Sequence, residues 1–263
     1  MKLAEMCERL IPAEIAYAEF NALRTAAVEE HSGIRRGVHE TLEYLVDPTR
    51  ESSSYYNRAV GRSADSLSDS ALCALPAGIV GLEVTPAQLT DELAGRLLAL
   101  RFQPAYQLCY LGLVPVAGAP PEREVVRLGP TDVDLFFDLL QLGGTEFPPE
   151  KRARKRGYYC TEEFRSYVSK TPDGVISGWG TMYVNGGVAF FGNSFTLPEF
   201  RKTGAHGALL AARLDDAARM GLEVAFTDVE HASQSHYNCE RAGFRTLSIT
   251  TIWKKRRVSE GLG

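Results

Sequence analysis

The turn Arg201-Lys-Thr-Gly-Ala-His-Gly207 holds the residues whose types and spacing are best suited to bind an anion. It joins a strand pattern to a helix pattern, so the free amides of the first helical turn would point at whatever binds there. Gly204 and Gly207 let the backbone come close to a ligand, and Arg201 adds positive charge. These features suit a pyrophosphate group; the alternative is an ordinary strand-to-helix connection with glycines for packing.

Carboxylate and imidazole side chains follow at the end of the next predicted strand, in the sequence Asp228-Val-Glu-His231. Alternation along a strand places Asp228 and Glu230 on one face, where either could accept a proton directly or through water. The simpler interpretation is that Glu230 and the histidine after it are solvated. The three histidines within 206–236 lack the spacing of metal ligands, and the five cysteines form no CxxC or CxH pattern. We therefore expect neither a metal site nor a disulfide framework.

The second half of the chain alternates strand and helix patterns that could position these residues. Two alternating runs flank the turn Asn185-Gly-Gly187, which is a strong hairpin signal. The basic run Lys151–Arg156 is typical of a solvated helix face. In chain order we predict a strand over 124–128, a helix over 131–142, hairpin strands over 174–183 and 188–195, a helix over 205–219, a strand over 223–228, a helix over 234–242 and a strand over 245–253.

The first half shows weaker patterns. Pro12 interrupts a helical spacing of apolar residues and predicts a break between two helices. Thr85 before Pro86 predicts the start of another helix. In chain order we predict two helices within 3–31, a strand over 78–84, a helix over 86–100, a strand over 107–115 and a proline-rich linker over 116–123. A domain boundary is expected in that linker.

The turn, together with the block Ser235-His-Tyr-Asn-Cys-Glu-Arg-Ala-Gly-Phe244, resembles the GNAT superfamily of N-acetyltransferases over about residues 123–255. Arg201 and Gly204 fit the family's turn, whereas His206 stands where a second small residue is expected. The resemblance implies that the amides of this turn bind the pyrophosphate of acetyl-CoA, the acyl donor, and that the preceding strand end pairs with the pantetheine arm and polarises the thioester carbonyl. The donor-binding residues that it implies are Phe195, Thr196, Leu197, Lys202, Thr203, Gly204, Ala205, His206, Gly207, Ala208, Ser235 and Asn238.

The resemblance leaves the catalytic residues partly open. The position at which many members have a tyrosine that protonates the departing thiolate is Cys239 here, and a small buried residue is the simpler interpretation of that cysteine. Tyr237 lies about 200° around an ideal helix from it, so the general acid could be Tyr237, Ser235, Cys239 or water. A base is needed because an alkylammonium has a pKa of about 10.4. We predict Glu230 and Tyr237 as the catalytic residues.

The first half resembles the superfamily more faintly. Leu89–Phe102 parallels the late helix and turn of the second half, and Tyr55-Tyr-Asn-Arg58 resembles a segment in the amino-terminal lobes of tandem acetyltransferase-like proteins. The phosphate-binding turn has no counterpart here. We therefore predict an α/β (α+β) fold of tandem GNAT-like lobes, each with a mixed, mainly antiparallel sheet flanked by helices. Residues 1–118 are expected to form a degenerate lobe that shapes the acceptor pocket or a dimer surface, and residues 119–263 the domain that binds acetyl-CoA.

Length and composition exclude several classes of protein. The chain has 263 residues, 44% hydrophobic and 24% charged, close to globular averages. Its net charge of -4 disfavours nucleic acid as a partner. The N-terminus carries charges among its apolar residues, and the most apolar stretch, 71–84, is too short to span a membrane. We expect a cytoplasmic protein with no membrane contact.

These features predict an acyltransferase that moves the acetyl group of acetyl-CoA to an amine of a small molecule or peptide by direct attack in a ternary complex. The acceptor is not identified, and a homodimer is left open. One alternative is a catalytically eroded sensor or scaffold that binds CoA. Another is a GNAT fold that performs a different acyl-CoA reaction, such as decarboxylation or hydrolysis.

Overall fold

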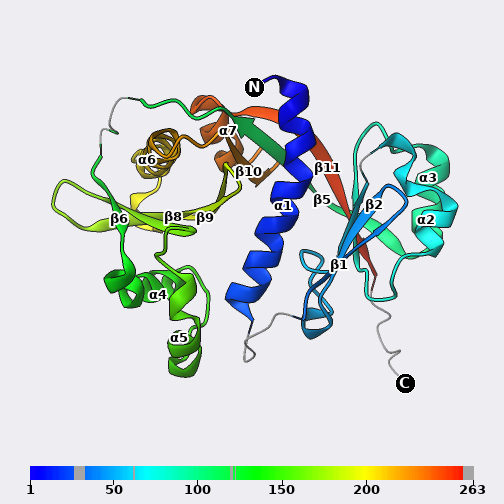
Figure 1. Ribbon diagram of the computed structural model, residues 1–263, viewed down its shortest axis with the longest axis horizontal. Helices are drawn as coiled ribbons and strands as arrows, with labels where there is room; N and C mark the ends of the chain where they lie inside the picture. Colours follow the sequence, from blue (N-terminus) through cyan, green and yellow to red (C-terminus); the bar gives the residue numbers. More distant parts are fainter. Residues whose placement is uncertain (27–32, 62, 119–120, 122, 257–263) are drawn as a thin grey trace.

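The computed structural model describes residues 1–26, 33–61, 63–118, 121 and 123–256. Within these residues eleven strands form one sheet in the order β1-β2-β3-β4-β11-β5-β10-β9-β8-β7-β6 (Figure 1). The strands are β1 Arg35–His39, β2 Leu42–Val46, β3 Arg58–Gly61, β4 Gly81–Val84, β5 Phe102–Leu113, β6 Val125–Leu128, β7 Phe164–Lys170, β8 Ile176–Asn185, β9 Val188–Thr196, β10 Val224–Glu230 and β11 Arg245–Lys255. The helices are α1 Leu3–Thr25, α2 Asp69–Cys73, α3 Asp91–Ala99, α4 Val133–Leu142, α5 Pro149–Lys155, α6 Ala205–Arg219 and α7 Gln234–Arg241.

The predicted fold class is confirmed, because a mixed and mostly antiparallel sheet is flanked by helices. Only the neighbours β3–β4 and β9–β10 are parallel among the strand pairs of the described residues. Outward from the central β5–β11 pair, both sides repeat the same strand senses: an antiparallel neighbour, then a parallel one, then antiparallel ones. The tandem character of the fold is therefore visible in its strand order.

The two halves of the sequence share this sheet. Strand β5, from the first half, lies between β10 and β11 of the second half, and β11 pairs with β4 of the first half. A division into units 1–118 and 119–263 is not tested by this arrangement and stays a prediction.

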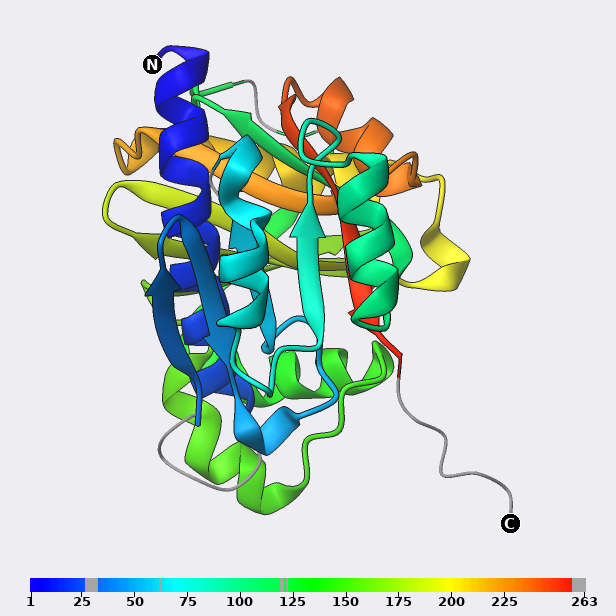
Figure 2. The same ribbon diagram turned by 90° about the vertical axis from the view of Figure 1, so that its right-hand side faces the viewer.

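Apolar layers cover both faces of the second-half strands. Tyr17 of α1 stacks on Phe190 on one face, and Leu209 of α6 and Cys239 of α7 belong to the same apolar cluster as Phe191 on the other. Successive residues of a strand point to opposite faces, so α1 lies on the opposite face of the sheet from α6 and α7 (Figure 1). A further layer packs α2 and α3 onto the first-half strands (Figure 2).

Pro12 does not divide the first helix, so the prediction of two helices was wrong. α1 runs through Pro12 as one helix of 23 residues. A proline inside a helix costs about 3 kcal/mol, but Leu10 and Ile15 on either side of it are both buried. Burial of large apolar side chains, each worth about 1.5–3 kcal/mol, offsets this cost. The part of the predicted range over 27–31 lies outside the described residues.

The third helix begins later than predicted. Thr90, not Thr85, caps α3, and its side chain accepts a hydrogen bond from Leu93 N at 3.1 Å. Thr85 instead begins a turn in which Gln88 N donates to its carbonyl oxygen at 3.1 Å. The helix over 205–219 has the predicted bounds, whereas β10 extends two residues further than predicted, to Glu230. No helix in the described part of the chain is long and apolar enough to cross a membrane.

Candidate active site

The sheet opens between the two parallel strands β9 and β10. Their hydrogen-bonded register ends at the pair Phe191 and Thr227, although β9 continues to Thr196 and β10 to Glu230. Beyond this pair the two strands diverge.

A bulge in β9 accompanies this opening. Thr181 of β8 pairs with Gly192, but Trp179, two residues away, pairs with Phe195, three residues away. The additional residue on β9 bends that strand. Asn193, within the bulge, has a φ of +45°, which is uncommon for a residue with a side chain.

A cavity of about 700 Å³ occupies the opening. Its walls come from both faces of the sheet, which we call the α1 side and the α6 side. The α1 side is lined by Tyr17, Asn21, Arg24, Thr25, Tyr55 and Tyr56, and the α6 side by His206, Leu210, Arg213, Ser233, Ser235 and Cys239. Two ligands that approach from opposite faces of the sheet could therefore meet in this cavity.

The predicted anion turn lies at the N-terminus of α6. Gly204 has a φ of +86°, and a Cβ atom at Gly204 or Gly207 would find open space. The first helical hydrogen bond runs from Ala208 N to Gly204 O at 3.0 Å, so the amides of Ala205, His206 and Gly207 have no carbonyl one turn before them in the helix. Helix dipole and free amides together favour an anion here.

Lys202 and Thr203, also predicted donor-binding residues, are exposed in the same turn. Lys202 has a φ of +63°. Arg123, which the sequence reasoning missed, donates from Nε to Thr203 O at 3.0 Å. Its Nη1 is buried and has no hydrogen-bond partner among the described residues. The turn is thus supported by a guanidinium group that still has an unused donor.

A hydrogen bond joins the first turn of α6 to the middle of α7. The amide nitrogen of Asn238 lies 2.9 Å from Nδ1 of His206; an amide can only donate, so Nδ1 accepts. Burial, with a smaller effect from Arg213, lowers the pKa of His206 to about 4. His206 is therefore neutral at pH 7 and carries its proton on Nε2. Ser235, predicted to contact the donor, lines the cavity beside this pair.

Phe195, Thr196 and Leu197 follow the bulge. They hydrogen-bond toward β8, with Leu197 N donating to Ser177 O at 3.1 Å. The ladder with β10 has already ended at this level, so the other edge of β9 is available to a ligand that lies between the strands. The side chain of Phe195 stacks on Trp179, with ring centroids 6.0 Å apart.

Arg213 is a buried cation that the sequence reasoning did not identify. Only 1% of its surface is exposed. Its guanidinium donates to Thr181 O and to Ser194 Oγ, both at 3.0 Å, and no carboxylate of the described residues forms an ion pair with it. Burial lowers its pKa to about 10, so the group stays charged at pH 7 and holds positive charge against the bulge.

The two candidate acids on α7 differ in position. Tyr237 is 52% exposed and does not line the cavity; its ring stacks on His236 with centroids 6.0 Å apart. Cys239 is buried and lines the cavity. Burial raises the pKa of its thiol to about 11, so Cys239 keeps its proton at neutral pH.

Asp228 lines the cavity near the end of β10. Burial raises the pKa of its carboxyl group to about 6; Glu14 raises it further and Arg58 opposes the shift. A carboxylate with a pKa close to the working pH is suited to accept a proton. Glu230, the predicted base, also lines the cavity but is exposed at its rim.

Buried ionic groups from three elements lie beside Asp228. Arg58 of β3 pairs with Glu14 of α1 and with Glu83 of β4, the latter with Nε and Oε1 3.0 Å apart. Tyr110 of β5 donates its hydroxyl to Glu83 at 2.9 Å, and burial raises the pKa of Glu83. Two buried carboxylates, Glu14 and Glu83, thus share one guanidinium, and Glu14 adds to the raised pKa of Asp228.

Helix α1 forms a wall that the sequence did not link to the site. Tyr17 accepts a hydrogen bond from Asn193 Nδ2 at 3.2 Å, and a Cβ atom at Gly192 would lie only 1.9 Å from the Tyr17 hydroxyl. The glycine therefore allows α1 to pack directly on the bulge. Asn21 and Arg24 continue the same wall.

Three potential metal ligands lie close together on the α6 side of the sheet. Ligand atoms of Cys109, His231 and His236 lie within 4.8 Å of one another. Nδ1 of His236 accepts a hydrogen bond from Ala232 N at 3.2 Å, and Nε2 lies 3.5 Å from a carboxylate oxygen of Glu240. Both ring nitrogens are thus engaged, and burial raises the pKa of the Cys109 thiol. These contacts favour a hydrogen-bonded cluster over a metal site.

Comparison with known proteins identifies the architecture. No protein-family model matches the sequence, and no curated protein matches it. A GCN5-related N-acetyltransferase from Kribbella flavida superposes with a TM-score of 0.62 at 14% identity, over 94% of this chain and 96% of that one. One from Sphaerobacter thermophilus gives 0.58 at 14% identity, over 83% and 81%. A functionally unknown conserved protein from Staphylococcus epidermidis ATCC 12228 gives 0.57 at 10% identity, over 89% and 98%.

Proposed function

The chain has the fold of the GCN5-related N-acetyltransferases, and we propose that it transfers the acetyl group of acetyl-CoA directly to an amine. The observation that carries this proposal is the cavity across the β9–β10 opening, which has free helix amides toward one end and a carboxylate of raised pKa on its wall.

The donor would bind on the α6 side. We assign its pyrophosphate to the amides of Ala205, His206 and Gly207, with Lys202 and Thr203 beside them. The exposed edge of β9 from Phe195 to Leu197 would pair with the pantetheine amides, as one strand edge pairs with another. Ser235 and Asn238 would contact the arm from α7.

We assign the polarisation of the thioester carbonyl to main-chain donors at the β9 bulge. Arg213 supports them, because it bonds Ser194 of the bulge and brings an uncompensated positive charge to the α6 side. Preorganised donors and fixed charge that face a developing oxyanion stabilise the transition state strongly.

We assign the acceptance of the amine's proton to Asp228. The amine nitrogen forms a bond to the carbonyl carbon, the C–S bond breaks, and the electron pair of that bond leaves with the CoA sulfur. The ammonium gives up one proton before attack and the new amide nitrogen a second one; one of these protons restores the CoA thiol and the other is released to solvent. Asp228 lies inside the cavity with a pKa of about 6, whereas Glu230 is exposed at its rim.

The departing sulfur has three candidate proton donors. Cys239 and Ser235 line the cavity, and water is the third. Tyr237 would need to rotate inward to serve. This position of Tyr237 is also the observation that favours the second candidate function, a protein that binds CoA without transferring the acetyl group.

Two measurements on the purified chain separate these functions. Acetyl-CoA should raise the melting temperature and protect the amides of residues 195–208 from hydrogen exchange. Release of free thiol from acetyl-CoA in the presence of primary amines should follow. Protection without thiol release over a broad amine panel would support the binding protein, and absence of both effects at millimolar acetyl-CoA would exclude both functions.

A further inference from the structure

We infer that the acceptor amine also carries a carboxylate, as in an amino acid or a short peptide, and that Arg24 binds this carboxylate in the cavity that Asp228 also lines. This inference rests on the proposed acetyl transfer and names the class of its acceptor.

The cavity is lined by a carboxyl group, that of Asp228, and by a guanidinium group, that of Arg24. Two further buried carboxylates, Glu14 and Glu83, act electrostatically with Asp228 and share the single guanidinium of Arg58. A protonated amine is attracted to such a group of carboxylates, which are poorly screened because they are buried.

Arg24 supplies the guanidinium group of the cavity lining. Its side chain is 6% exposed and lines the cavity. It donates from Nε and Nη2 to Asn21 Oδ1 at 3.2 and 2.6 Å and from Nη1 to Tyr159 Oη at 2.9 Å. A guanidinium has five N–H groups, so two remain. No carboxylate of the described residues forms an ion pair with it.

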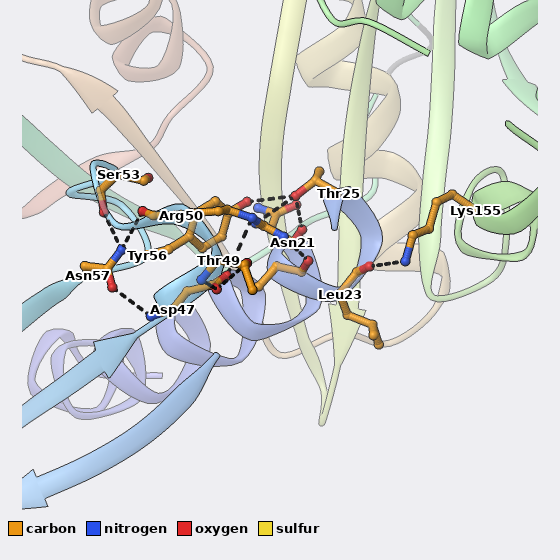
Figure 3. A network of polar contacts seen from close by, with 11 residues as sticks. Asn21, Leu23, Thr25, Asp47, Thr49, Arg50, Ser53, Tyr56, Asn57 and Lys155 are labelled. Carbon is orange, nitrogen blue, oxygen red and sulfur yellow. Dashed lines mark hydrogen bonds and ion pairs between the residues drawn. The ribbon is translucent and has the colours of Figure 1, made fainter. Parts of the chain in front are cut away.

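Neighbouring cations have partners that explain them. Arg50 donates to Ala22 O at 2.5 Å and Lys155 to Leu23 O at 3.0 Å (Figure 3). These carbonyls belong to the last turn of α1, where cations are stabilised by the helix dipole. Arg24 lies in the same turn, and its guanidinium carbon lies 5.0 and 4.5 Å from the ring centroids of Tyr159 and Phe164. It contacts neither an end carbonyl nor an acid.

Arg24 and Arg50 also affect the pKa of a nearby lysine, Lys151. Burial lowers the pKa of Lys151, and Arg24 and Arg50 lower it further. Arg50 has an acid partner, Asp47, with Nε and Oδ2 3.5 Å apart, whereas no carboxylate of the described residues pairs with Arg24. A zwitterion that extends along α1 would place its ammonium group near Asp228 and its carboxylate near Arg24.

The helix sets the length of such an acceptor. Tyr17, which contacts the bulge, and Arg24 are seven residues apart, which is about 10 Å along the axis. Helical side chains lean toward the N-terminus, so the guanidinium lies nearer to Tyr17 than the axial distance suggests. The rings of Tyr55 and Tyr56, whose hydroxyls contact Asn21 and Thr25 of α1, also line the cavity. They pack edge to face with centroids 4.8 Å apart, a surface suited to an alkyl chain.

Matched acceptors test the inference on the wild-type chain. Thiol release from acetyl-CoA would be measured with ω-amino acids from glycine to 8-aminooctanoate and with alkylamines of the same lengths. A charge-assisted pair is worth about 10- to 100-fold, so the best amino acid should exceed its alkylamine by at least about tenfold in kcat/KM. Equal or better use of the alkylamines would overturn the carboxylate inference while leaving acetyl transfer intact.

If neither series releases thiol, the proposed transfer fails, and calorimetry of 5-aminopentanoate against pentylamine with CoA present decides the carboxylate site. Binding of only the amino acid supports it, and equal binding of both, or of neither, removes it.

Variants then assign the effect to Arg24. Arg24→Gln should raise KM for the amino acid about tenfold or more and change kcat/KM for the alkylamine less than twofold, whereas Arg24→Lys should keep part of the preference. Arg156→Gln is the control, because Arg156 is an exposed guanidinium paired with Asp134. Equal losses for both acceptor series in Arg24→Gln would show a structural role instead. If that variant does not fold, the wild-type comparison decides.

Discussion

The two parallel strand pairs of the sheet, β3–β4 and β9–β10, have the same place in the repeated strand order but different endings. The ladder of β9 and β10 stops before the strands end, and a cavity follows. The ladder of β3 and β4 pairs Val60 with Glu83, next to the ends of both strands.

Side chains close the first-half counterpart of the opening. Gln88 is buried, donates to Ser63 O at 2.9 Å and accepts from Thr85 N at 2.8 Å. A Cβ atom at Gly61 would lie 2.5 Å from Ser66 Cβ and 2.8 Å from Gln88 Nε2. Protein atoms therefore fill the space that a pantetheine arm would need.

The connecting helices differ in the same sense. After β9 comes α6, with 15 residues and free N-terminal amides, whereas after β3 comes α2, with five residues. The hydroxyl of Ser68 accepts a hydrogen bond from Ala71 N at the start of α2 at 3.2 Å. A shared strand order thus does not make a shared binding site; the turn and the side chains at the strand ends decide. The first half contributes Arg58 and Glu83 to the surroundings of Asp228 instead.

The largest expected effect concerns that carboxylate. A general base contributes about 10²- to 10⁴-fold, so Asp228→Asn should lower kcat by at least about 100-fold, and wild-type kcat/KM should fall as the pH drops through about 6, where Asp228 takes up its proton. Glu230→Gln is the matched control at the rim. A larger loss from Glu230→Gln than from Asp228→Asn would return the base to the residue predicted from sequence.

The pH dependence of the unfolding free energy gives an independent test of the raised pKa of Asp228. Its pKa is raised from 3.8 to about 6 by folding, so between these values the folded state binds the extra proton and the wild type loses stability as the pH rises. The unfolding free energy of Asp228→Asn relative to wild type should therefore increase from pH 4 to pH 6, by about 3 kcal/mol at most. Chemical denaturation at several pH values measures this, and a difference that does not change with pH would contradict the raised pKa.

The next effect compares the two halves directly. Gly207 in α6 and Gly95 in α3 are both exposed helical glycines with open space at Cβ. Gly207→Glu places a carboxylate among the amides assigned to the pyrophosphate and should raise the Kd of acetyl-CoA about tenfold or more. Gly95→Glu should leave Kd unchanged. Helix propensity improves in both variants, so loss of folding cannot produce the difference; equal Kd values would remove the α6 turn from donor binding.

Removing the Gln88 side chain, which fills the first-half counterpart of the opening, should lower the stability of the protein without changing acetyl-CoA binding. Gln88→Ala leaves Thr85 N and Ser63 O without their partner and should lower the unfolding free energy by about 1–3 kcal/mol. Because α2, the helix that follows β3, has only five residues, calorimetry should still find one acetyl-CoA per chain with the wild-type Kd. A second bound acetyl-CoA in this variant would show that Gln88 alone prevents binding there.

The smallest expected effect is at Tyr237. Since its ring is half-exposed and outside the cavity lining, Tyr237→Phe should change kcat less than twofold in the thiol-release assay. Cys239→Ala and Ser235→Ala test the two donors inside the cavity. A loss of tenfold or more in Tyr237→Phe alone would mean that α7 rearranges when the donor binds.

Local chemistry was enough to predict much of this molecule from its sequence. The glycine turn before α6, the β8–β9 hairpin and the bounds of α6 depend on residues that are neighbours in the chain, and they were predicted correctly. The predictions made from Pro12 and Thr85 were wrong. Burial of the apolar side chains of α1 outweighs the hydrogen bond lost at Pro12, and Thr90, not Thr85, caps α3.

Only the tertiary structure decided which charged groups face the cavity. Asp228 and Glu230 are equivalent by strand alternation, and they differ because burial raises the pKa of Asp228, with Glu14 adding to the shift and Arg58 opposing it, whereas Glu230 is exposed. Arg24 and Arg213 carry no sequence signal of their own. A buried charge acquires its role from the groups that replace water around it, and those groups come together only when the sheet closes on α1 and α6.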